Sequence, residues 1–196
     1  MGIVYQLLQI AHKVRARDFA GAEAQLRKAV EAYPGYAEAW QELGDLLVVR
    51  NRNTEAREAF LQAIASDHRY AKPRLSLARL AATERDWQGA LDSAESLLEL
   101  DAFSYPQAYY FDALANYYMG NREKALEQAQ QAVRLDKAHV VPWAEGLLGT
   151  LYSDTGDYSA AAEQFRNCIR HAQPGMNLDE MKRLEAAARA AQATRE

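Results

Sequence analysis

The residue types best suited to chemistry in this chain are its histidines, its single cysteine and its closely spaced carboxylates. The histidines are His12, His68, His139 and His171. They are widely separated, and none belongs to an H-E-x-x-H sequence or accompanies a cysteine pair, the patterns that hold a zinc ion. We therefore expect structural or solvent-facing roles for all four, with no metal site and no cofactor.

The pair Glu42 and Asp45 is the clearest example of closely spaced carboxylates. One helical turn would bring the two side chains to the same face, an arrangement that can serve acid–base chemistry. Such pairs are far more common on solvated helix faces. The sequence also contains no glycine-rich phosphate loop and no G-x-S-x-G turn. We therefore predict that the protein is not an enzyme.

The composition predicts an all-helical protein without a nucleic-acid partner. Helix-forming residues such as Ala, Leu, Glu, Gln and Arg dominate over the 10 glycines and 5 prolines. The net charge is −4, and charges of both signs are interspersed, so no basic stripe could follow a phosphate backbone.

The location of the protein follows only indirectly from the sequence. The single cysteine excludes an intrachain disulfide framework and fits a reducing compartment. The first residues lack a basic region and a cleavage site, and Gln6 and Gln9 interrupt their apolar run. No membrane span is predicted. We expect a cytoplasmic protein, while a periplasmic or secreted location stays open if a targeting segment precedes Met1.

A short phrase, a turn followed by the start of a helix, recurs along the chain. The alanines that end it are 34, 34, 35 and 36 residues apart, which is the spacing of a helical repeat. These alanines are Ala22, Ala56, Ala90, Ala125 and Ala161. Apolar residues recur at three- and four-residue steps on both sides of the turn, so each unit is predicted to form two helices.

Residues at the turns and boundaries fit this division into helices. Four units offer Asp18, Asp86, Asn121 or Asp157 as the N-cap of the second helix, and the remaining unit offers Asn53 or Thr54. The prolines fall between units or in the first turn of a helix, where a missing N–H does no harm. They are Pro34, Pro73, Pro106, Pro142 and Pro174.

Two units carry an ordered set of large and small residues. The second has Trp40, Leu43, Gly44, Leu47, Ala56, Phe60 and Ala63, and the fifth has Leu148, Gly149, Tyr152, Gly156, Tyr158, Ala161 and Phe165. This order resembles the W-x-x-L-G-x-x-Y…A…F…A pattern of the tetratricopeptide repeat. The resemblance implies an all-α fold, a right-handed α-solenoid of antiparallel helix pairs. It places repeats near 3–36, 37–70, 71–105, 106–141 and 142–175 in a single domain over 1–196.

Further positions refine this scheme. Asn177 and Glu180 form a capping box that predicts a capping helix over 177–193. Small residues such as Gly44 and Gly149 are expected to face the alanines of the second helix and allow close approach. Cys168 stands where other units carry alanine, which predicts a packed thiol. Two positions depart from the family pattern: Ile10 replaces a small residue, and Asp112 replaces leucine, so it requires either a partner or a rotated helix.

The resemblance also implies a concave groove, lined by the first helix of each repeat, that binds a peptide or protein segment. The residues carried over to this groove are Glu42, Asp45, Arg79, Tyr110, Phe111, Leu114, Tyr118 and Trp143. The groove is expected to be acidic at one end and aromatic at the other, and the aromatic residues are the best candidates for a hot spot. The alternative is ordinary packing between repeats, which burial of Tyr110, Phe111, Tyr117 and Tyr118 together would establish.

The expected partner is a protein or peptide with apolar anchors and a basic end. Groove positions such as Glu42, Ser76 and Phe111 cannot form the Lys and Asn clamp with which some members of the family hold a terminal carboxylate. Two alternatives stay open. Apolar residues at the amino end, such as Leu7 and Leu8, fit a self-assembly module that stacks through terminal repeats as a homodimer. The chain could also be a non-catalytic part of a larger protein or complex.

Overall fold

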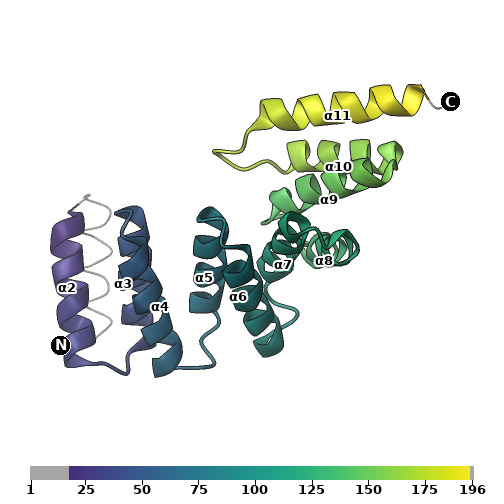
Figure 1. Ribbon diagram of the computed structural model, residues 1–196. Helices are drawn as coiled ribbons and strands as arrows, with labels where there is room; N and C mark the ends of the chain where they lie inside the picture. Colours follow the sequence, from purple (N-terminus) through teal and green to yellow (C-terminus); the bar gives the residue numbers. More distant parts are fainter. Residues whose placement is uncertain (1–17, 195–196) are drawn as a thin grey trace. The chain divides into compact units, whose positions relative to one another are not determined.

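The computed structural model describes residues 18–194, and every regular element in that range is an α-helix (Figure 1). The predicted all-α class is therefore confirmed. The chain divides into two compact units, one up to Glu84 and one from Arg85 onward. This boundary falls at the turn within the third predicted repeat. The single domain expected over 1–196 stays a prediction.

The first unit is built around one apolar core. Its helices are α2 (Phe19–Ala32), α3 (Ala37–Val49), α4 (Asn53–Ser66) and α5 (Lys72–Thr83). Each contributes apolar side chains to the same buried cluster, including Leu26 from α2, Leu43 and Leu47 from α3, Phe60 from α4 and Leu80 from α5. The core thus lies where successive helices pack against one another.

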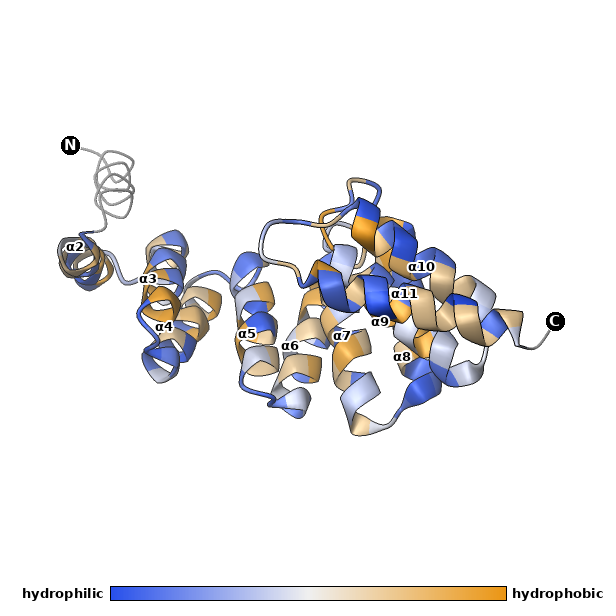
Figure 2. Ribbon diagram, turned by 90° about the horizontal axis from the view of Figure 1, so that it is seen from above, coloured by the Kyte–Doolittle hydropathy of each residue, from blue (hydrophilic) through white to orange (hydrophobic). Residues whose placement is uncertain are grey.

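The second unit stacks a first single helix, two helix pairs and a final helix. Its helices are α6 (Trp87–Leu100), α7 (Pro106–Met119), α8 (Arg122–Leu135), α9 (Pro142–Thr155), α10 (Tyr158–Arg170) and α11 (Leu178–Ala193). Hydrophobic and hydrophilic residues intermingle along each of these ribbons (Figure 2), as expected for amphipathic helices. Met181, Leu184 and Ala188 of α11 pack on the cluster around Phe165 of α10.

Helix starts follow the predicted local chemistry at most turns. The carboxylates of Asp18, Asp86 and Asp157 accept the N–H groups of the residues three positions on, at 2.9, 3.0 and 3.1 Å. Asn177 likewise accepts the N–H of Glu180 at 3.2 Å. Proline occupies the first turn of α5, α7 and α9, as predicted.

Two cap predictions were wrong. Asn121 precedes α8 but makes no cap hydrogen bond. Its side-chain amide instead donates to Oδ1 of Asn116 at 3.0 Å. Helix α4 begins at Asn53, so its N-cap is Arg52, which has no side-chain oxygen to accept a hydrogen bond. Here the guanidinium binds Glu55 in the first turn of α4.

The small residues of the first helices admit aromatic rings from the second. A Cβ atom added at Gly44 would lie 2.4 Å from the Phe60 ring, and one added at Gly149 would lie 2.8 Å from the Phe165 ring. These glycines were expected to face the alanines of the second helix, but the nearest atoms belong to the two rings. Ala56 and Ala161 are nevertheless completely buried, so they also have no room for a larger side chain.

Replacing Ala56 or Ala161 by leucine is expected to destabilise the fold by roughly 1–3 kcal/mol, because each methyl group lies in a closely packed interior. Urea unfolding followed by circular dichroism measures the change. Ala65→Leu is the matched control, since Ala65 is exposed on the same helix as Ala56. Equal unfolding midpoints for Ala56→Leu and Ala65→Leu would contradict the helix register.

Among the helices in residues 18–194, none combines the length and the apolar character that a membrane span requires.

Candidate partner-binding surfaces

A polar network joins the facing sides of α3 and α5 in the first unit. Gln41 is buried, and its amide donates to the carboxylate of Asp45 at 2.9 Å and to the hydroxyl of Ser76 at 3.0 Å. Buried amides of this kind need such partners to offset their desolvation. Gln41 therefore fixes the position of the Asp45 carboxylate on this surface.

Basic residues offset the acidic end of the expected groove. Lys72 Nζ lies 3.4 Å from Glu42 Oε1 and 3.5 Å from Asp45 Oδ2, and Arg79 Nη2 lies 3.6 Å from Asp45 Oδ1. The structure thus brings Glu42, Asp45 and Arg79 together, as carried over from the repeat pattern. The surface they form has mixed charge rather than the acidic character expected from sequence.

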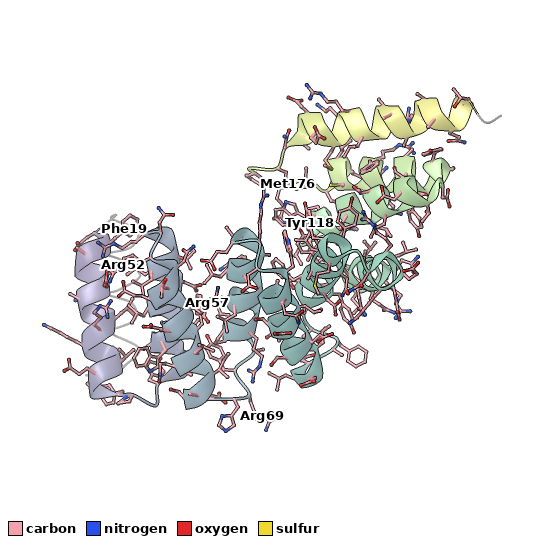
Figure 3. The ribbon with its side chains drawn as sticks, in the orientation of Figure 1. Phe19, Arg52, Arg57, Arg69, Tyr118 and Met176 are labelled. Carbon is pink, nitrogen blue, oxygen red and sulfur yellow. The ribbon has the colours of Figure 1, made fainter. Side chains whose placement is uncertain are left out.

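A second charged cluster in this unit has a structural role. The guanidinium groups of Arg27, Arg50 and Arg52 converge on the buried carboxylate of Glu23 on α2. Burial raises the pKa of Glu23, but the hydrogen bonds from Arg27 and Arg52 outweigh this and lower it overall. Figure 3 shows Arg52 beside α2, so the cluster connects the start of α4 to α2.

The second unit contains a pocket of about 360 Å³ that is lined mainly by apolar side chains. Helices α7 and α9 form one wall, and the segment between α10 and α11 forms another. The lining residues are Tyr110, Leu114, Trp143, Gly146, Leu147, Thr150, Cys168, Gly175, Met176, Asn177, Glu180 and Met181. The absence of a side chain at Gly146 opens the floor, where an added Cβ would lie 3.3 Å from the sulfurs of Cys168 and Met181.

Three of the predicted aromatic-end residues meet in this pocket: Tyr110, Leu114 and Trp143. The other two lie outside its lining. Phe111 packs against Tyr110 with ring centroids 5.2 Å apart, and Tyr118 stacks on Trp87 of α6 at 4.2 Å. The expected aromatic surface is therefore divided between a pocket and a stacked pair.

The four aromatic residues proposed as a test of ordinary packing are not all buried. Tyr118 is 57% exposed, whereas Tyr110, Phe111 and Tyr117 are half-buried. The guanidinium of Arg122 lies 3.9 Å from the centre of the Tyr117 ring. Trp143 at the pocket is 43% exposed, so its indole is available for contact.

The pocket wall formed by the segment before α11 and by the first turn of α11 was not predicted from the sequence. Met176 and Met181 line the pocket, and Figure 3 shows Met176 in the segment that leads into α11. The capping helix was expected only to cover the last repeat. A signal was nevertheless present, since two methionines near a helix start are unusual on a purely solvating cap and are adaptable contacts for a ligand.

Two ionisable groups in the pocket remain protonated at physiological pH. Burial raises the pKa of Tyr110 to about 12, and the phenol therefore keeps a hydrogen that it can donate. Burial and then the nearby charge of Glu145 raise the pKa of Cys168 to about 11. A neutral, completely buried thiol agrees with the predicted packing role of Cys168.

Two of the histidines that are widely separated along the sequence are in contact in the structure. His139 and His171 are stacked on one another beside the carboxylate of Glu145. They lie in separate loops, and the close packing of α9 and α10 brings these loops together. His68 is exposed in the first unit, and His12 lies outside the described residues.

Comparison of the sequence with protein-family models finds the tetratricopeptide repeat at three places. One model of this repeat matches residues 7–72 and 42–105, and a second matches residues 146–171. The first model thus covers half of the chain. A search of curated protein sequences finds no significant match.

Solved structures with the same architecture are close in fold and distant in sequence. MamA superposes with a TM-score of 0.72 at 23% identity, covering 87% of this chain and 95% of the other. PilF of Pseudomonas aeruginosa gives 0.76 at 17% identity, with 94% and 87% covered. YrrB, described as a TPR protein with an unusual peptide-binding site, gives 0.66 at 20% identity, with 89% and 88% covered.

These likenesses establish the fold, and the matching models establish the family. The predicted solenoid of helix pairs is confirmed by neighbouring structures that are themselves tetratricopeptide repeat proteins. Proteins of this kind are generally non-catalytic modules for protein interaction. The chain belongs to the tetratricopeptide repeat family.

Proposed function

We propose that this protein is a non-catalytic adaptor that binds a peptide segment of another protein, with an apolar side chain of the peptide inserted into the pocket of the second unit. The observation that carries the proposal is the convergence of Tyr110, Leu114 and Trp143 with Met176 and Met181 around one opening. Its volume of about 360 Å³ lies at the lower end of the range for ligand pockets and suits one or two anchoring side chains.

The chemistry of the lining supports a peptide with an apolar anchor. Rigid aromatic groups offer a large contact area at low entropic cost, and thioethers adapt to side chains of different shape. The phenol of Tyr110 and the hydroxyl of Thr150 provide polar groups for a peptide backbone. Glu180 lies at the pocket and favours a basic residue next to the anchor. The peptide-binding site reported for YrrB is a precedent within the same architecture.

The mixed-charge surface of Glu42, Asp45 and Arg79 is less suited to binding an apolar anchor. Its groups already pair with one another and with Lys72, so a partner would have to break these contacts before making its own. We therefore do not assign the apolar anchor to this surface. Self-association through the apolar amino end rests on residues that lie outside those the structure describes, and it stays a prediction.

Trp143→Ala is expected to weaken binding of a selected peptide roughly 10- to 100-fold, because it removes an exposed aromatic wall of the pocket. Peptides are first selected from a displayed random library with the full chain as target. Their affinities are then measured by fluorescence anisotropy for the wild type and the variant.

Phe103→Ala is the matched control for this experiment. Phe103 is 80% exposed in the same unit but does not line the pocket, so its removal should leave the affinity unchanged. Equal losses in both variants, or selected peptides without an apolar anchor, would count against the pocket as the binding site.

A further inference from the structure

His139, Glu145 and His171 form a compact cluster of nitrogen and oxygen donors in the second unit. The Nδ1 atom of His171 lies 2.8 Å from Oε1 and 3.0 Å from Oε2 of Glu145. The Nδ1 atom of His139 lies 3.6 Å from the same Oε1. The two imidazole rings are stacked, with centroids 3.5 Å apart and planes inclined by 18°.

The surrounding backbone holds these side chains in place. His139 has a left-handed backbone conformation, with φ of +52°, in the turn between α8 and α9. The buried carboxylate of Asp136 supports this turn by accepting the N–H groups of Val140 at 2.8 Å and Val141 at 2.6 Å. Across the cluster, the side-chain amide of Gln173 donates to the carbonyl oxygen of Val140 at 3.2 Å. The segments that carry the two histidines are therefore connected to each other.

Hydrogen bonding accounts for the position of His171 but not for that of His139. An imidazole N–H from His171 satisfies the carboxylate of Glu145, but the His139 nitrogen at 3.6 Å is beyond hydrogen-bond range. The Glu145 side chain is buried, with the residue 6% exposed. Within the described part of the chain, the two imidazoles are the only basic groups at ion-pair distance from it. A shared cation would engage both rings and compensate the buried charge.

We propose that His139, Glu145 and His171 form a binding site for a zinc ion. Neutral imidazole nitrogen and ionised carboxylate oxygen are ligands that this ion prefers, at about 2.0–2.2 Å. One donor atom from each residue lies within 4.8 Å of the other two. Tetrahedral coordination at those bond lengths needs donors roughly 3.3 Å apart, so the two imidazoles would rotate out of their stacked arrangement to complete the site. Three protein ligands leave the fourth position to water.

The ion would join two segments that are distant in the sequence. His139 belongs to the turn before α9, and His171 begins the segment that supplies Gly175 and Met176 to the pocket wall. Coordination therefore restrains one wall of the pocket from outside it. Metal binding can be tested separately from the proposed peptide binding, because none of the three ligands lines the pocket.

The test uses the full chain and two metal probes. Titration with Co²⁺, which substitutes for zinc in such sites, is expected to give visible d–d absorption bands that saturate at one ion per chain. Calorimetric titration with Zn²⁺ should give the same stoichiometry, and Zn²⁺ should raise the Tm. His139→Ala and His171→Ala should each reduce the affinity roughly tenfold or more.

His68→Ala is the control, because His68 is exposed in the first unit, and it should bind Zn²⁺ like the wild type. Because a variant of the cluster could also disturb folding, protection of the wild-type histidines provides a second measurement. Zn²⁺ should shield His139 and His171, but not His68, from modification by diethyl pyrocarbonate. Absence of saturable Co²⁺ bands, binding that survives the double variant His139→Ala/His171→Ala, or no selective protection would each overturn the proposal. None of these outcomes bears on the affinity of the selected peptides.

Discussion

Replacing Asp112 by asparagine is expected to stabilise the fold by roughly 1–3 kcal/mol at neutral pH. Asp112 is 2% exposed on α7. Burial raises the pKa of its carboxyl from 3.8 to about 6, although Lys124 and a hydrogen bond from Asn116 act in the opposite direction. A difference of about two pH units corresponds to about 3 kcal/mol of unfavourable ionisation. Asparagine keeps an oxygen that can accept the hydrogen bond now donated by Asn116 at 2.6 Å.

The stability gained by Asp112→Asn is expected to depend on pH. The folded protein prefers the protonated carboxyl. The contribution of Asp112 to stability is therefore complete below pH 3.8, its ordinary pKa, and is lost as the pH rises through about 6, its pKa in the folded protein. The Asp112→Asn variant has no carboxyl at this position, so it does not lose this stability as the pH rises. The gain in the free energy of unfolding should therefore be larger at pH 7.5 than at pH 3.5, when both are measured by urea unfolding.

Asp92→Asn is the matched control, since Asp92 is exposed on α6 in the same unit. It should change stability by no more than about 0.5 kcal/mol. A gain for Asp112→Asn that is the same at both pH values would show that packing, rather than ionisation, causes the effect.

Replacing Phe165 by alanine is expected to destabilise the second unit by roughly 3–5 kcal/mol. The ring is almost completely buried and lies directly over Gly149. Glycine has no side chain that could move into the vacated space, so a cavity remains and adds to the lost burial. Urea unfolding of the full chain measures the loss, and Phe103→Ala provides an exposed-ring control in the same unit. Similar stabilities for the two variants would contradict the packing of α9 against α10.

A double variant separates cavity formation from general disruption. Gly149→Ala alone should be destabilising, because its Cβ would lie 2.8 Å from the Phe165 ring. In the background of Phe165→Ala that ring is absent, and the added methyl group partly fills the cavity. The two changes should therefore be non-additive, with the double variant more stable than the sum of the single effects predicts. Simple additivity would indicate that the two positions are not in contact.

The sequence by itself determined the repeat and most of its local details. The spacing of Ala22, Ala56, Ala90, Ala125 and Ala161 predicted helix pairs, and the pairs that lie entirely within residues 18–194 form. Caps such as Asp18 and Asp157 and the prolines in first turns were also predicted correctly. The caps and first-turn prolines depend on residues within about one turn of each other, and the repeat depends on a regular spacing along the chain, so the sequence is sufficient to reveal both.

The partners of buried polar groups could not be predicted from the sequence. Asp112 was recognised as a departure from the repeat pattern, but its partner Asn116 was not. Asn116 in turn draws Asn121 away from the cap of α8. The competition between a cap and a side-chain acceptor depends on which group the folded turn places nearer, and the residue types alone do not decide it.

Only the tertiary structure decided which distant residues share a site. Tyr110 and Trp143 meet Met176 because α7, α9 and the segment before α11 pack around Gly146. His139 and His171 face Glu145 because the turns at the ends of α8 and α10 lie side by side. These contacts join residues separated by many turns of helix, and repeat spacing predicts the helices but not the paths of the loops between them. The pocket and the histidine cluster therefore follow from loop packing, which is a property of the whole folded unit.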